Sequence, residues 1–146
     1  MTTAEQLDQP IDASHELAIS AARHAIAKKA TDVVVINMRE LVSFADYMVV
    51  CTGQTSRQTK AIAAEVRRSL REEGARSRRV EGDKEGEWIL IDLLDVIVHV
   101  FTPESRDFYR LDRLWRRAPQ EIIVDDQPPL AVAAAVSILD DVAQGD

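Results

Sequence analysis

Two short apolar segments, separated by only two residues, constrain the fold of this chain more than any other feature. Segments 88–93 and 96–101 are rich in β-branched residues, which favour strands. Since only residues 94 and 95 separate them, we expect an antiparallel hairpin. Side chains alternate along a strand, so one face of this hairpin is purely aliphatic and the other mixes aromatic, aliphatic and ionisable groups.

The aliphatic face of the hairpin is expected to lie in the core; it carries Ile89, Ile91, Val96, Val98 and Val100. The expected pairs across the two strands are Ile91 with Val96, Leu90 with Ile97, and Trp88 with His99.

The mixed face of the hairpin predicts a protein-binding surface. Its residues are Trp88, Leu90, Ile97, His99 and Phe101, with Asp92 near the turn. Such a mixture is poor core chemistry but typical of an interaction hot spot. The alternative interpretation is that a helix covers this face and that His99 finds its hydrogen bonds locally.

The remaining segments complete an αββαβββα order, which predicts a single α/β domain with a mixed sheet flanked by helices. Helices are expected from Ser14, as N-cap, to Lys29, and from Thr55 to Glu73, where Gly74 ends the second one. A last helix is expected from Pro103, with one side formed by Phe108, Leu111, Leu114 and Trp115. Further strands are expected over 33–38, 47–52 and 76–80.

The charge distribution divides the chain into three parts. The net charge is −7, but all 18 basic residues lie within 14–118 together with 16 of the 25 acidic ones. We therefore predict an acidic N-terminal tail over 1–13, a folded domain over 14–118, and an acidic extension over 119–146 with a short helix at 130–142. Acidic ends of this kind usually act as solvated tails.

Bulk composition excludes several classes of protein. Hydrophobic residues are 46% and charged residues 29%, as in a soluble globular domain. No apolar run approaches the length of a membrane span, which is about 18 residues or more. The acidic N-terminus does not resemble an export signal, and the single cysteine, Cys51, cannot form an internal disulfide. We expect a cytoplasmic protein without a membrane partner.

Catalysis is not expected, and neither is a cofactor. The acids at strand ends are Asp46, Asp92 and Asp95, and they lack the alternate spacing that would hold Mg²⁺ for nucleotidyl transfer. The three histidines have no cysteine or carboxylate at ligand spacing. Cys51 lies in an apolar strand, which predicts an inert packed thiol. A metal-dependent nucleotidyltransferase is kept as an alternative.

Segment 55–79 is basic and offers a second alternative, an RNA-binding module. Arg67, Arg68 and Arg71 lie together on its expected helix, and such a cluster can contact phosphate. A solvated helix face with i,i+4 ion pairs explains the same charges.

Several motifs, in order and spacing, resemble one family over about residues 14–117. They are DYMVVCTG at 46–53, SRQ at 56–58, EG at 81–82, GEW at 86–88, DLLDVIVHVF at 92–101 and RDFYRLDRLW at 106–115. Together they are similar to the Iojap-related ribosome-silencing factors of bacteria and organelles.

This resemblance implies a function as well as a fold. The fold would be nucleotidyltransferase-like, without the catalytic metal site. The function would be that of a translational repressor, which binds the large ribosomal subunit through ribosomal protein fourteen and blocks joining with the small subunit. A homodimer and a peripheral contact with ribosomal RNA are also expected.

The resemblance also points to individual residues. Trp88 matches the family's partner-facing aromatic residue, and the other characteristic positions are Asp92, Asp95, His99, Arg106 and Tyr109. The predicted partner-binding set consists of Trp88, Asp92, His99, Arg106 and Tyr109 together with Leu90 and Phe101 of the mixed hairpin face. One position departs from the family pattern: Leu94 stands where the family often has glycine, and a leucine tolerates a positive φ poorly.

Overall fold

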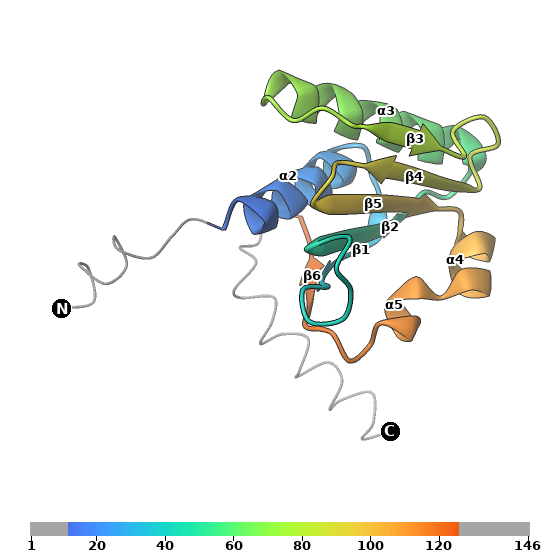
Figure 1. The fold of residues 1–146 in the computed structure, drawn as a ribbon. Coiled ribbons are helices and arrows are strands. Elements are labelled where there is room, and N and C mark those ends of the chain that lie inside the picture. Colours follow the sequence, from blue (N-terminus) through green and yellow to red (C-terminus); the bar gives the residue numbers. More distant parts are fainter. Residues whose placement is uncertain (1–11, 126–146) are drawn as a thin grey trace.

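A six-stranded mixed sheet organises residues 12–125, the part of the chain that the computed structural model describes (Figure 1). Its strand order is β3-β4-β5-β2-β1-β6. Strands β2 and β5 run parallel, and the other neighbouring pairs run antiparallel. In chain order the elements are α2 (Ala13–Ala27), β1 (Thr31–Asn37), β2 (Tyr47–Thr52), α3 (Ser56–Glu72), β3 (Arg79–Glu81), β4 (Trp88–Asp92), β5 (Val96–Phe101), α4 (Pro103–Tyr109), α5 (Leu111–Leu114) and β6 (Gln120–Ile123).

The sheet separates two apolar clusters, one on each face. On the first face, α2 and α3 lie side by side over the strands (Figure 1). On the second face, the α5 segment and the loop between β1 and β2 contribute the covering side chains. Strand alternation divides the residues between them: Val33 and Val35 belong to the first cluster, and Val34 and Ile36 belong to the second. The prediction of a single α/β domain with a mixed sheet flanked by helices is confirmed.

Helix α3 follows its sequence pattern closely. The Thr55 hydroxyl accepts a hydrogen bond from the Gln58 N–H at 3.1 Å and caps the helix. Ile62, Val66 and Leu70 follow one another at intervals of four residues, so they share one face of the helix, and all three are completely buried against the sheet. The helix therefore supplies much of the first cluster while its other faces meet solvent.

Helix α2 begins two residues earlier than predicted. Asp12, rather than Ser14, is the N-cap, and its carboxylate accepts from the His15 N–H at 3.1 Å. Both residue types cap helices well, so sequence alone did not decide between them. The Ser14 hydroxyl instead donates to Asp46 at 2.7 Å, outside the helix.

The β4–β5 hairpin forms, but its predicted register is wrong by two residues. Ile91 pairs with Val98, and Trp88 pairs with Phe101. The turn is tight: the Leu93 N–H donates to the Val96 carbonyl at 2.9 Å, leaving Leu94 and Asp95 at its tip. A shift of two residues preserves alternation, so the aliphatic side chains still face the first cluster as predicted.

The segment after β5 differs from the single predicted helix. Arg110 adopts a left-handed conformation, with φ 50° and ψ 49°, and separates α4 from α5. Leu111 and Trp115 pack onto the second cluster, whereas Phe108 and Leu114 point into solvent. A continuous helix would have placed all four on one side.

Strand β6 lies beyond Pro119, where we expected the folded part to end, and that expectation is wrong for residues 120–123. β6 pairs antiparallel with β1, and the Asn37 N–H donates to the Pro119 carbonyl at 2.9 Å. A proline is tolerated at the start of an edge strand because its missing N–H is not needed there. The helix predicted over 130–142 lies outside the described residues.

Candidate docking face

The second face of the sheet is only partly covered. Its buried cluster is formed by Val34, Ile36, Met38, Met48, Val50, Phe101 and Ala118, with half-buried side chains packed around it. Trp88 and Ile97 are among those half-buried side chains. A sheet face that ends in half-buried aromatic and aliphatic groups can gain further burial from a partner.

An aromatic cluster occupies the side of this face next to α4. It consists of Trp88, His99, Phe101, Phe108 and Tyr109, and Trp88 lies at its centre. The Trp88 ring centroid lies 4.4 Å from that of Tyr109 and 5.2 Å from that of Phe101. Phe108 stacks on Tyr109 at 4.9 Å and extends the cluster outward. These are the separations of favourable aromatic pairs.

A hydrogen bond from Trp88 fixes the tautomer of His99 at the base of this cluster. The Trp88 Nε1–H donates to His99 Nδ1 at 3.0 Å. Burial lowers the pKa of His99 to about 4, so the ring is neutral at pH 7 and carries its proton on Nε2. Within residues 12–125 no acceptor pairs with that Nε2, although the residue is only 4% exposed. Such an unpaired donor costs free energy until an acceptor reaches it.

Helix α4 presents the outer part of the cluster. Thr102 caps the helix, and Pro103 occupies its first turn, where a missing N–H costs nothing. Seven residues later the left-handed Arg110 ends the helix. The result is a short rigid element whose last residues, Phe108 and Tyr109, are 72% and 49% exposed.

The loop between β1 and β2 borders the same face. Met38 and Val42 pack onto the second cluster, whereas Leu41 and Phe44 are exposed, Phe44 by 60%. Hydrogen bonds from the Leu41 and Val42 N–H groups to the Met38 carbonyl hold the start of the loop in a turn. The loop and α4 therefore both offer exposed apolar side chains beside the sheet face.

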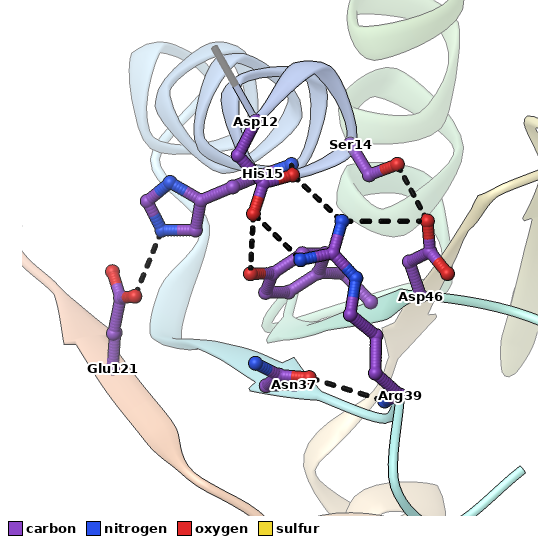
Figure 2. Close-up of polar contacts among 8 residues, drawn as sticks. Asp12, Ser14, His15, Asn37, Arg39, Asp46 and Glu121 are labelled. Carbon is purple, nitrogen blue, oxygen red and sulfur yellow. Dashed lines mark hydrogen bonds and ion pairs between the residues drawn. The ribbon is translucent and has the colours of Figure 1, made fainter. Parts of the chain in front are cut away.

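A polar network fastens this loop to the start of α2 (Figure 2). The Arg39 guanidinium makes two hydrogen bonds of 2.7 Å to the Asp12 carboxylate and lies 3.5 Å from Asp46. The Tyr47 hydroxyl also donates to Asp12, at 3.2 Å. The hydrogen bonds from Arg39 hold the pKa of Asp12 well below its usual range. The bidentate geometry orients the loop more strongly than a single contact would.

Two residues of the predicted partner-binding set have structural contacts. The buried Asp92 carboxylate accepts from the Leu94 N–H at 2.9 Å and from Arg78 at 3.1 Å. Arg106 donates to the Thr52 hydroxyl at 2.9 Å and to the Asp32 carbonyl, and it pairs with Asp112 at 3.2 Å.

The other predicted residues stay with the second face. Phe101 and His99 are buried, Trp88 and Leu90 are half-buried, and Tyr109 is exposed. Asp92 therefore stabilises the hairpin turn through its hydrogen bond with Leu94. Arg106 connects α4 to the ends of β1 and β2 through hydrogen bonds.

Four exposed apolar residues were not among the site residues predicted from the sequence: Leu41, Phe44, Phe108 and Leu114. Phe108 was expected on the same side of one continuous helix as Leu111, Leu114 and Trp115, and no pattern in the 38–46 loop distinguishes exposed from packed side chains. The one signal in the sequence was that so short a loop contains several large apolar residues.

The described residues give little support for a catalytic or metal site. Within 12–125, no group of three or more His, Cys, Asp or Glu side chains is placed to hold a metal ion. Burial raises the pKa of the Cys51 thiol to about 12, which makes it a poor nucleophile at neutral pH. In the same range, no helix is long and apolar enough to cross a membrane.

Comparison with known proteins gives a consistent result. Residues 11–142 match the protein family described as "Ribosomal silencing factor during starvation". A ribosomal silencing factor of Halalkalibacterium halodurans is 42% identical over 92 residues, which cover 63% of this chain and 79% of that protein. The mouse protein named "Mitochondrial assembly of ribosomal large subunit protein 1" is 27% identical over 121 residues, which cover 81% of this chain and 50% of that protein. A crystal structure of a Chromobacterium violaceum protein superposes with a TM-score of 0.69 at 33% identity, covering 80% of this chain and 98% of that one.

Proposed function

Because this chain belongs to the family of ribosomal silencing factors, we propose that it represses translation by binding the large ribosomal subunit and occupying space that the small subunit needs. The family name and the relatives describe ribosome silencing. The steric mechanism is what the family resemblance of the sequence implies, and we adopt it as part of the proposal. This mechanism requires a folded domain with one partner-binding face, and it requires no chemical reaction.

The single observation that carries the proposal is the exposed aromatic cluster on the second face. Phe108 and Tyr109 project from α4, and Trp88 lies directly behind them. Interfaces draw most of their binding free energy from a few aromatic groups in a well-packed centre. Trp88, anchored by its bond to His99, is suited to be that centre, and the exposed pair is suited to be the contacting surface.

The predicted partner on the large subunit is ribosomal protein fourteen, as the family resemblance of the sequence implies. The name of the mouse relative, which refers to assembly of the ribosomal large subunit, supports a partner on that subunit. The unpaired His99 Nε2–H adds a chemical requirement: the partner, or a bridging water, should supply an acceptor near this donor.

The contacting residues that we propose differ from the set expected from sequence. The central residues are Trp88, Phe108 and Tyr109, with Leu90 beside them and Leu41 and Phe44 on the opposing loop. Phe101 and His99 form the floor of the site, while Asp92 and Arg106 position the elements that carry it. Truncation of a contacting residue should affect binding directly, whereas loss of Asp92 or Arg106 should act through the fold.

Cytoplasmic location, absence of catalysis and a homodimer are further parts of the proposal. Ribosomal subunits are the target, and competition for space needs no active site. Calorimetric titration with nucleotides, with and without Mg²⁺, should give no heat of binding. Sedimentation equilibrium of the free protein tests the homodimer.

A subunit-joining assay tests the function. Isolated large and small subunits are mixed with increasing amounts of the protein, and joined ribosomes are measured by light scattering. We expect joining to fall when the protein is incubated with large subunits first, and to be unaffected when it meets ribosomes that have already joined. Equal joining at all protein concentrations would contradict the steric mechanism.

A further inference from the structure

Three arginine side chains gather around one small pocket at the C-terminal end of α3. The pocket has a volume of about 190 Å³ and is lined by Arg67, Arg71, Arg76 and Ser77; we refer to these four residues as the arginine site. Arg67 Nε donates to the Ser77 hydroxyl at 3.4 Å. All three arginines are exposed. The site therefore presents three positive charges and a hydroxyl group around one volume.

The turn after α3 explains how these residues meet. Arg67 and Arg71 are four residues apart, so they share one face of the helix. Gly74 then adopts φ +98°, and the N–H groups of Gly74 and Ala75 donate to the carbonyls of Arg71 and Leu70. This pair of bonds is the Schellman arrangement, which reverses the chain at a helix end. The chain therefore returns beside α3, and Arg76 and Ser77 reach the pocket.

The acidic residues near this site are engaged elsewhere. Glu65 and Glu72 both pair with Arg68, at 2.7 and 2.9 Å. Glu73 accepts from Ser20 and His24, which lie on α2. Among residues 12–125, none of the three arginines of the site forms an ion pair. The structure thus separates Arg68, which is neutralised, from its neighbours, which keep uncompensated charge.

The helix dipole does not account for this cluster. Cations are common in the last turn of a helix, because the C-terminus carries a charge equivalent to roughly −0.5. Three guanidinium groups exceed that charge about sixfold, and Arg76 lies outside the helix. Mutual repulsion among them makes the site unfavourable when empty and favourable for an anion.

We infer that Arg67, Arg71, Arg76 and Ser77 bind a phosphate group of an RNA backbone. Guanidinium groups match phosphate oxygens with paired hydrogen bonds. The pocket is smaller than the roughly 300–1,000 Å³ of sites for whole small molecules, and its lining offers no aromatic or apolar side chain to a base. The site therefore recognises the phosphate group and not the base. The choice of RNA as its source rests on the proposed function, since a protein bound to the large subunit meets RNA.

The arginine site is separate from the docking face. Helix α3 covers the first face of the sheet, whereas the aromatic cluster lies on the second. The two surfaces can therefore be altered one at a time, and each can be tested without the other.

Fluorescence anisotropy with a labelled RNA hairpin tests the inference on the full chain. Arg71→Gln and Arg68→Gln form a matched pair, because both remove one charge from the exposed surface of the same helix. We expect Arg71→Gln to weaken RNA binding about tenfold, as for loss of one charged hydrogen bond, and Arg68→Gln to change it by less than about twofold. Equal losses in the two variants would overturn the site, because they would show non-specific attraction.

The salt dependence of binding gives a second readout. The slope of log Kobs against log salt should fall by about one for each arginine of the site that is removed. The variant carrying Arg67→Gln, Arg71→Gln and Arg76→Gln should therefore lose most of the slope. A triple variant that binds the hairpin as tightly as the unmodified protein contradicts the inference.

Competition experiments distinguish the two sources of phosphate, an RNA backbone and a free nucleotide or pyrophosphate. Unlabelled RNA should displace the labelled hairpin, whereas ATP and pyrophosphate at equal phosphate concentration should not; displacement by ATP alone would overturn RNA as the ligand. Trp88→Ala should bind the hairpin normally. If RNA binding fails while joining is still inhibited, the site is wrong and the proposed function stands; the reverse result removes the function and leaves the site.

Discussion

The two faces of the sheet differ in how completely they are covered. The first face is sealed by α2 and α3, and its residues from the β4–β5 hairpin are aliphatic and fully buried. The second face carries aromatic and half-buried groups, and it contains two buried donors, His99 Nε2 and Trp115 Nε1, without partners among the described residues. A face whose buried polar groups are all hydrogen-bonded stabilises the fold. Buried donors without a partner cost stability, and their presence indicates a surface that binds another molecule. We assign stability mainly to the first face and recognition to the second.

Matched truncations on the two faces should show the largest difference. Ile91 is completely buried on the first face, and Ile97 is half-buried on the second. Ile91→Ala should lower the free energy of unfolding by about 2–5 kcal/mol. Ile97→Ala should cost only about 1–2 kcal/mol, because less of its surface leaves water on folding. Urea denaturation measures both, and equal losses would break the comparison.

Trp88→Ala, on the second face, should mainly lower the affinity for large subunits rather than the free energy of unfolding. A central tryptophan typically contributes about 2–4 kcal/mol to an interface, so affinity for large subunits should fall roughly 30- to 1,000-fold. The measurement is a titration of large subunits with labelled protein. Circular dichroism of the variant serves as its control, and a folded variant with unchanged affinity removes Trp88 from the interface.

His99 gives the second face a pH dependence. Its pKa is about 4 when folded and 6.5 when unfolded, so the unfolded chain binds the extra proton first. Stability is therefore lost as the pH falls from 6.5 towards 4, by about 3 kcal/mol for this group. Urea denaturation across this range should show a smaller loss for His99→Gln than for the unmodified protein. Parallel losses would mean that His99 does not titrate in this way.

The smallest effect is expected at the hairpin tip. Leu94 has φ +80° in the first central position of a two-residue turn, where glycine is favoured. Leu94→Gly should raise the free energy of unfolding by about 1 kcal/mol, since relief of the left-handed strain exceeds the added entropy of the unfolded chain. Thermal denaturation measures this change. A lower melting temperature would show that the Leu94 side chain has a packing role.

The sequence predicts the strands and faces better than the connections. The alternating pattern of 88–101 predicts which side chains face the core. That prediction is correct despite the error in register, because a shift of two residues leaves each side chain on the same face. The register itself depends on which residues form the turn. The break at Arg110 was not predictable, because arginine has no preference for a left-handed conformation.

The candidate site was predictable in part. Trp88, His99 and Phe101 follow from strand alternation and come together with Tyr109 as an aromatic cluster. The roles of Asp92 and Arg106 depend on contacts with Arg78 and Thr52, which are distant in sequence. The arginine site required knowledge of which carboxylates pair with Arg68, a choice made by side-chain packing rather than by spacing.

Sedimentation of the protein with isolated ribosomal subunits tests the central claim most directly. The variants are Phe108→Ala, on the docking face, and Val124→Ala, an exposed apolar control after β6. Wild type and Val124→Ala should sediment with large subunits and not with small ones. Phe108→Ala should bind at least about tenfold more weakly, as expected for an interface aromatic residue. Binding of Phe108→Ala equal to that of wild type, or equal binding to both subunits, would contradict the assignment of recognition to the second face.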